Sequence, residues 1–125
     1  MDPFLERGIC LFNRGEFFEA HEVWEAAWTP SRGPRRLFLQ SLIHVTVGAY
    51  HATRGNPEGA VRQLRKALSK MERYLPEYEG VDLARLNRET RLLLGAVEVG
   101  AAAGRYPRIE CRMPAAGPVP GPQAG

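Results

Sequence analysis

The sequence predicts an all-α fold, a compact bundle of about five helices built from two helical hairpins and one further helix. Apolar residues recur at intervals of three and four, which is the spacing of one buried helix face. No segment shows the sustained alternation of apolar and polar residues that a half-buried strand would need. A pattern of helix end, Arg-Gly turn and early alanine also returns after 40 residues, as expected for a repeated hairpin.

Capping and breaking residues set the limits of the first two helices. Asp2 can accept hydrogen bonds from the free amide groups of a first turn, and Pro3 already has a helical φ angle. Gly15 ends this helix, since glycine turns the chain at little steric cost. The sequence predicts helices over residues 3–14 and 16–28, and a turn with two prolines and a glycine over residues 29–34.

Glycine and proline also delimit the other three helices. The third is free of charged side chains over residues 37–53 and should occupy the centre of the bundle. Gly55 ends it, Pro57 starts the fourth helix, and Pro76 stops that one. Asp82 can cap the fifth. These helices are predicted over residues 35–54, 57–75 and 83 to about 99, with a loop over residues 76–80.

The hairpin repeat aligns residues 11–15 with residues 51–55, and Ala20 with Ala60. In each copy a glycine permits the tight turn, and the small alanine lets two helix axes approach closely. This unit looks like the helical hairpin of tetratricopeptide repeats. Two units are fewer than the three that a free-standing solenoid needs, so we expect the fifth helix to close the open side of a bundle.

Composition divides the chain into a folding domain over residues 1–103 and a tail over residues 104–125. The tail holds five of the ten prolines and four of the thirteen glycines. Such a segment buries too little apolar surface to offset the entropy of ordering it, so we expect the tail to be disordered. Much of the net charge of +3 lies in the tail, and the domain has no overall charge that would indicate a polyanion as partner.

The expected location of the protein is the cytoplasm. Cys10 and Cys111 form neither a metal-binding spacing nor a disulfide framework, which indicates a reducing compartment. The first eight residues lack the positive charge and the apolar run of a signal peptide. Residues 37–53 are too few, and contain too many polar side chains, to cross a membrane.

Polar residues on the central helix are the most informative feature of the sequence. At about 100° per residue they share one arc of that helix. His21 interrupts the apolar face of the preceding helix, with Glu25 one turn further on. A tight turn between the two helices would bring His21 level with Gln40 and His44. The residues of the arc are Arg36, Gln40, His44, His51 and Arg54.

This cluster has three interpretations. The first is a metal site of His21, Glu25 and His44, because imidazole and carboxylate ligands suit zinc or iron. The second is a network of buried hydrogen bonds that binds no ligand. The third is a cleft between the second and third helices that binds a peptide or a small ligand, with Trp28 and Tyr50 as apolar walls. Nothing resembling a nucleophile stands beside His21.

The fourth helix offers a separate alternative, which is nucleic-acid binding through a basic face. Five basic side chains lie off its apolar stripe and could follow phosphate groups. Glu58 and Glu72 partly neutralise this face, and such a stripe is usually solvated surface, so we do not expect nucleic acid as a partner. The five residues are Arg62, Arg65, Lys66, Lys70 and Arg73.

Several segments together form a recognisable pattern. They are residues 11–22, Trp24, Glu25, Trp28, residues 39–43, Tyr50, His51 and residues 54–60. This pattern resembles the prokaryotic family named domain of unknown function 309, over residue 4 to about residue 94. The resemblance implies a small cytosolic all-α bundle with no established activity. It singles out Phe17, Glu19, Ala20, His21, Glu22, Glu25, Trp28, Gln40, His51, Arg54, Gly55, Asn56 and Ala60.

The sequence departs from the family pattern at two positions. Ser41 stands where the family has glycine, and His44 where it often has glutamine. Glutamine is a poor metal ligand, so the second departure weakens the metal interpretation and favours a polar network or a cleft.

We therefore predict a binding or interaction module rather than an enzyme. No cofactor is expected, and the partner would be a protein or a small ligand, or a second copy in a homodimer. The alternative is a metal-dependent enzyme centred on His21, Glu25 and His44. The predicted site residues are His21, Glu22, Glu25, Trp28, Gln40, His44, His51 and Arg54.

Overall fold

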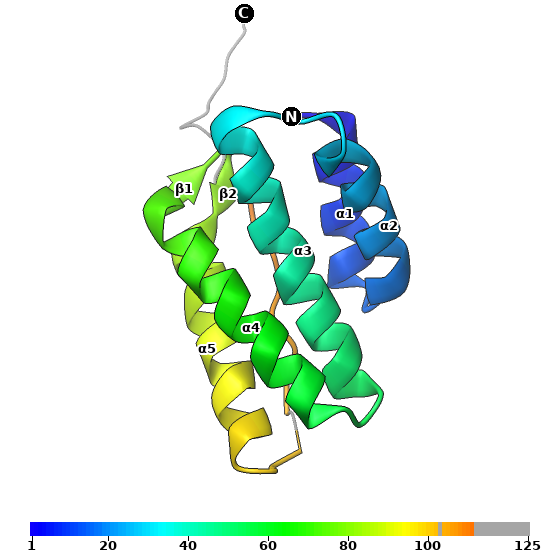
Figure 1. Ribbon diagram of the computed structural model, residues 1–125, viewed down its shortest axis with the longest axis vertical. Helices are drawn as coiled ribbons and strands as arrows, with labels where there is room; N and C mark the ends of the chain where they lie inside the picture. Colours follow the sequence, from blue (N-terminus) through cyan, green and yellow to red (C-terminus); the bar gives the residue numbers. More distant parts are fainter. Residues whose placement is uncertain (103, 112–125) are drawn as a thin grey trace, which may run out of the picture.

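The computed structural model describes residues 1–102 and 104–111, and in this part of the chain five α-helices form one bundle (Figure 1). The all-α prediction is confirmed. A short 3₁₀ turn, η1, and a hairpin of two-residue strands are the other regular elements there. The elements are α1 (Pro3–Asn13), α2 (Phe17–Trp28), α3 (Gly33–Thr53), α4 (Pro57–Met71), η1 (Glu72–Tyr74), β1 (Glu77–Tyr78), β2 (Val81–Asp82) and α5 (Leu83–Glu98).

The helices pack in the order in which they follow along the chain. α1 packs on α2, α2 on α3, α3 on α4, and α4 on α5. α3 lies in the middle of Figure 1, between α2 and α4. Most of its residues from Phe38 to Ala49 are buried. The prediction that the charge-poor helix is central is therefore confirmed.

Local capping explains where the helices begin. Asp2 Oδ1 accepts hydrogen bonds from two amide groups in the first turn of α1, at 2.7 and 3.0 Å. Asp82 accepts one in the same way from the amide of Arg85, at 3.0 Å. α3 begins earlier than predicted, because Pro34 fits the first turn of a helix, where a missing N–H costs no hydrogen bond.

The segment after α4 differs from the prediction. The α-helix ends at Met71 rather than at residue 75, and the chain continues as the 3₁₀ turn. β1 and β2 then pair antiparallel, with Tyr78 opposite Val81. Strands of two residues are too short to produce an alternating pattern, so they could not be predicted from the sequence.

The two hairpins repeat at a spacing of 40 residues. Gly15 and Gly55 follow α1 and α3 with φ angles of 79° and 70°, where other residues would be strained. Gly8 and Gly48 lie where the two helices of each hairpin cross. A Cβ atom at Gly8 would lie 2.1 Å from an indole atom of α2, and one at Gly48 would lie 2.6 Å from Leu64. Each hairpin therefore needs glycine both at its turn and at its crossing point.

Residues 105–111, called the strap below, form a nearly straight segment that passes behind α3 in Figure 1. Ile109 is only 1% exposed and belongs to the core. Asn13, at the end of α1, makes two hydrogen bonds with the main chain of Ile109. At the other end of the strap, Cys111 forms an antiparallel bridge with Val81. The strap therefore joins the first hairpin to the segment before α5.

The expectation of disorder from residue 104 onward is wrong for residues 104–111. Composition averages over the whole tail, whereas Pro107 and Ile109 find buried places against helices that are distant in the sequence. The packed unit therefore extends past residue 103. The remaining part of the predicted tail, residues 112–125, lies outside the described residues.

Two further expectations concern the membrane and the cysteines. Among the described residues, no helix combines the length and the apolar character needed to cross a bilayer. Cys10 and Cys111 are both free thiols, and both are exposed.

Candidate functional site

A pocket of about 220 Å³ opens between α2 and α3, toward the end of α3 that leads into α4. Its walls are mainly apolar, and the rings around it pack near one another. Phe18 lies 6.0 Å from Tyr50 and 6.4 Å from His21, measured between ring centroids. The six residues that line this α2/α3 pocket are Phe17, Phe18, His21, Val47, Tyr50 and His51.

Helical spacing explains how each helix contributes three neighbouring side chains. On α2, the residues at positions 17, 18 and 21 share one side, because positions three and four apart lie on the same face. On α3, the residues at positions 47, 50 and 51 do so for the same reason. Phe17 is buried, whereas Phe18 is 50% exposed and stands at the rim. An apolar ring that is half in water at the mouth of a pocket is a candidate contact for a ligand.

His21 lies at the pocket with a carboxylate beside it. Its Nε2 atom is 3.2 Å from a carboxylate oxygen of Glu25, one helical turn further along α2. The His21 side chain is 32% exposed and that of Glu25 is 46% exposed. The pair is therefore open to water and to a ligand, and it is not a buried ion pair that serves only the fold.

His51 is oriented by the turn that leads into α4. The Asn56 carboxamide oxygen accepts a hydrogen bond from the amide of Gly59 at 3.1 Å, which leaves the Asn56 NH₂ group for His51 Nδ1 at 3.3 Å. His51 Nδ1 must then accept, so the neutral ring carries its proton on Nε2. The ring of His51, which is among the residues that line the α2/α3 pocket, thus has its N–H donor at Nε2.

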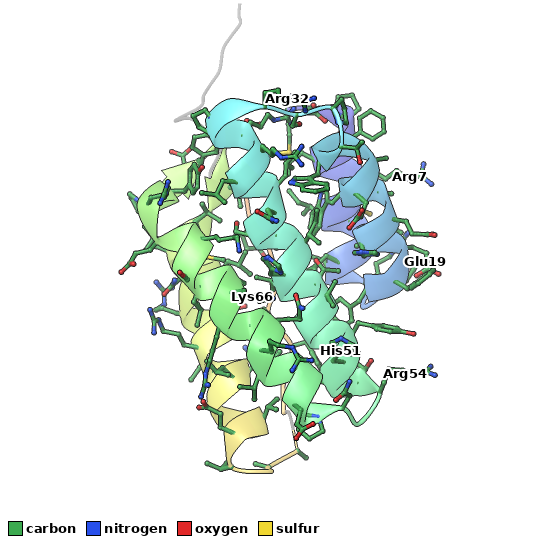
Figure 2. All side chains as sticks on the ribbon, viewed as in Figure 1. Arg7, Glu19, Arg32, His51, Arg54 and Lys66 are labelled. Atoms are coloured by element: carbon green, nitrogen blue, oxygen red, sulfur yellow. The ribbon has the colours of Figure 1, made fainter. Side chains whose placement is uncertain are left out.

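Arg54 is placed just beyond the pocket. Its guanidinium carbon lies 5.7 Å from the centre of the Tyr50 ring, within the range of a cation–π contact. Figure 2 shows Arg54 reaching away from the bundle near the end of α3, with His51 close to the same end. Arg54 therefore places a positive charge near the pocket but does not line it.

The structure does not bring the predicted metal ligands together. His44 Nδ1 is hydrogen-bonded to Gln63 of α4 at 2.7 Å, whereas His21 pairs with Glu25. Among the described residues, no three histidine, cysteine, aspartate or glutamate side chains are grouped as ligands of one ion. Among the described residues His21, Glu25 and His44 therefore do not form one group, because the face of α3 that carries His44 packs on α4.

Burial controls the charge of His44. The removal of the ring from water lowers the pKa of His44 from its ordinary value of 6.5, while the hydrogen bond that the ring donates to the Gln63 carboxamide oxygen acts in the opposite direction. The nearby Lys70 and Lys66 ammonium groups lower this pKa further. His44 is therefore a neutral hydrogen-bonding residue between α3 and α4 at neutral pH.

Trp28 and Arg36 form a clamp at the other end of α2. The guanidinium carbon of Arg36 lies 3.9 Å from the centre of the Trp28 ring. Arg36 also donates hydrogen bonds to the main-chain oxygens of Trp28 and Ser31, at 3.2 and 3.1 Å. Arg36 thus stabilises the turn between α2 and α3. Trp28 was predicted to be an apolar wall of the cleft, but it does not line the α2/α3 pocket.

The other predicted residues stand apart from the α2/α3 pocket. Gln40 is half-buried and Glu22 is exposed, and neither lines it. The polar arc of α3 does exist, but its two histidines bond to Gln63 and Asn56, at separate places. The two histidines of α3 therefore form separate hydrogen-bonded pairs and are not joined in the single polar cluster that was predicted.

Three of the five basic side chains predicted to form a face border a different hollow, a wide groove of about 710 Å³ between α4 and α5, whereas Lys70 and Arg73 do not line it. Arg62, Arg65 and Lys66 line it, together with the carboxylates of Glu58 and Glu98. Arg65 is paired with Glu98. Acidic groups thus stand among the basic ones, which weakens the attraction that phosphate groups would feel.

Four residues that line the α2/α3 pocket or orient its His51 were not predicted as site residues from the sequence. Phe17 and Asn56 belong to the family pattern but were not predicted to form the site. Phe18 and Val47 were not among the predicted site residues either. One available signal was the run of two phenylalanines ahead of His21, which is more apolar surface than one helix face can bury. The second was the spacing of three and four between Val47, Tyr50 and His51.

Comparison with known proteins supports the resemblance to the family. The model of the family described as "Domain of unknown function (DUF309)" matches residues 5–63, which include all six residues of the α2/α3 pocket. A protein of Aquifex aeolicus (strain VF5), named "Uncharacterized protein", is 24% identical over 97 residues. The aligned region covers 77% of this chain and 29% of that protein, so the chain spans less than a third of the relative's length.

Proposed function

We propose that this chain, whose residues 5–63 belong to the DUF309 family, is a binding module that holds one planar apolar group of its ligand in the α2/α3 pocket. The observation that carries the proposal is the lining: aromatic and aliphatic walls with two imidazoles among them. Small-molecule sites usually measure about 300–1,000 Å³. A hollow of about 220 Å³ suits one ring or one side chain better than a nucleotide.

The chemistry of the walls favours an aromatic group with a polar substituent. Rings at centroid distances of about 4.5–7 Å attract one another in tilted arrangements, and Phe18 and Tyr50 could hold a third ring in this way. His51 Nε2–H can donate a hydrogen bond, while the pair of His21 and Glu25 can accept one. A phenol hydroxyl can do both. The ligand we propose is therefore a tyrosine-like side chain of a partner protein.

Titration with p-cresol, which has the atoms of a tyrosine side chain, tests this proposal. Eight heavy atoms at about 0.5 kcal/mol each imply a dissociation constant on the order of 1 mM. In a ¹⁵N and ¹³C NMR titration, the shift changes should be concentrated on the six residues of the α2/α3 pocket. Toluene should bind more weakly, because it lacks the hydroxyl group.

A matched pair of variants distinguishes binding of p-cresol in the α2/α3 pocket from non-specific binding to exposed apolar side chains. Phe18→Ala should abolish saturable p-cresol binding, whereas Phe4→Ala should not. The two phenylalanines are 50% and 52% exposed, but Phe4 lies on α1 outside the pocket. If both variants bind p-cresol as the parent does, or if shift changes scatter over the surface, the proposal fails.

The same proposal includes a cytoplasmic location, which the two free, exposed thiols support. Fractionation of cells of the source organism, with reaction of the thiols in the intact extract, tests this part. Recovery of the protein with oxidised thiols outside the cytoplasm would contradict it.

A further inference from the structure

The strap is held by its main chain, from three different elements. The Asn13 carboxamide donates to the carbonyl of Ile109 and accepts from the amide of Ile109, both at 2.8 Å. Glu89 of α5 accepts from the amide of Arg108 at 2.8 Å, and the amide of Asp82 donates to the carbonyl of residue 110 at 2.8 Å. A site that pairs with both peptide groups of one residue recognises extended backbone, whatever the side chain.

Side chains of the strap alternate between the bundle and the solvent. Pro107 and Ile109 are buried, whereas Arg108 between them is exposed. At one end, the ring of Tyr106 lies 5.7 Å from that of Phe17. The strap thus combines fixed backbone bonds with two apolar anchors two residues apart, as extended peptides do in the grooves that bind them.

The link between α5 and the strap contributes little to holding it. Residues 99–102 and Gly104 are exposed, and they consist of glycine, alanine and one valine. Gly100 turns the chain with a φ of 72°. Because this link is small and exposed, the strap is held by its own contacts with α1, β2 and α5.

We propose that the groove between the end of α1, β2 and α5 is a peptide-binding site, which residues 105–111 fill in cis and which an extended segment of a partner protein fills in trans. The partner segment would carry the pattern of the strap: proline, a basic residue, a branched aliphatic residue and an acidic residue. Because the link joins the strap covalently to α5, the strap has a high effective concentration at the groove. A partner segment therefore binds only where its affinity or its concentration is high enough to displace the strap. This inference does not rest on the function proposed for the α2/α3 pocket, although Tyr106 of the strap lies against Phe17, which lines that pocket.

Cleavage of the link tests the groove in the folded chain. Residues 100–104 are replaced by a protease recognition site, and the purified full-length protein is cut while folded. A fluorescent peptide with the sequence of residues 105–111, carrying Cys111→Ser, is then added. We expect the peptide to exchange with the cut strap and to bind saturably, with at least tenfold weaker binding by uncut protein.

Two controls make the result specific. A peptide with Ile109→Asp should bind at least tenfold more weakly, because it places a charge in the buried anchor site. Protein with Asn13→Asp should also bind the original peptide at least tenfold more weakly, because the side chain can no longer donate to the carbonyl of Ile109. Circular dichroism of the cut protein monitors whether the helices stay folded.

Three outcomes would overturn the proposal. The cut strap could remain bound without exchange, which would make it a fixed part of the core. The helices could unfold as the strap leaves, which would also show that the strap is a fixed part of the core. The strap could also exchange only into a second copy of the chain and form a dimer, while the free peptide fails to bind.

Discussion

Gly59→Ala should move the His51 ring away from its place in the α2/α3 pocket while the bundle stays folded. A Cβ atom at position 59 would lie 2.7 Å from Asn56 Nδ2, and 2.9 and 3.0 Å from Cδ2 and Cγ of His51. Carbon atoms in contact need about 3.5 Å. The ring must therefore shift by about 0.5 Å or rotate, and the 3.3 Å hydrogen bond between Asn56 and His51 is lost.

The expected change in stability is small, because two effects oppose each other. The lost hydrogen bond costs about 0.5–1.5 kcal/mol, and a ring forced off its rotamer costs about as much. Alanine in a helix stabilises the folded state by about 0.5–1 kcal/mol relative to glycine, which offsets part of this loss. The net loss of about 0–2.5 kcal/mol is less than the total stability of a typical domain, which is about 5–15 kcal/mol.

Urea unfolding and NMR of the histidine ring protons measure the two consequences separately. The His51 resonances should shift, and p-cresol affinity should fall about fivefold, which corresponds to the loss of one hydrogen bond of about 1 kcal/mol. Gly95→Ala on α5 is the control, because a Cβ there would meet nothing within 4 Å. It should raise the stability and leave the pocket unchanged. Unmoved His51 resonances in folded Gly59→Ala protein would refute the packing and the proton assignment derived from it.

Three further predictions concern packing, protonation and the strap. Gly48→Ala should destabilise the protein by about 1–3 kcal/mol in urea, because the new Cβ would lie 2.6 Å from the Leu64 side chain and 3.3 Å from its backbone nitrogen; a loss below about 0.5 kcal/mol would mean that the helices separate easily. Burial lowers the pKa of His44, so the unfolded chain binds this proton more readily, and stability should fall as the pH drops from 6.5 toward the lower pKa of the folded state. The slope is at most about 1.4 kcal/mol per pH unit, and urea curves at pH 7 and pH 5 should show that His44→Gln removes this component; an identical pH dependence in the variant would contradict the assignment. Asn13→Ala should speed hydrogen exchange of the Ile109 amide at least tenfold, since its acceptor is removed; unchanged exchange would mean that burial alone protects it.

Those parts of the fold that depend on local interactions could be predicted from the sequence. Asp2 and Asp82 cap the helices as expected, because a cap bonds to amides only two or three residues away. The strap could not be predicted, because Asn13 and Ile109 are 96 residues apart and neither is unusual in its own segment. The end of α4 was also missed, since a 3₁₀ turn continues the same apolar spacing for a few residues.

Some of the residues that the sequence singled out line the α2/α3 pocket, and others lie elsewhere. The sequence indicated a cleft between the second and third helices, and His21, Tyr50 and His51 do line a pocket there. It also grouped His44 with them, because periodicity gives the face of a helix but not the neighbour that this face meets. Gln63, on the helix after that, bonds to His44 instead.

The α2/α3 pocket occupies the junction where the first hairpin meets the second. Forty residues after Phe17 and His21 come Pro57 and Val61, and these line the groove at the next junction, between α4 and α5. The same place in the repeat is thus a hollow twice, once bordered by aromatic and imidazole rings and once by arginine and lysine. The core residues fix the helices, while the residues at each junction are free to differ. A fold of this kind can change what one junction holds without altering the other.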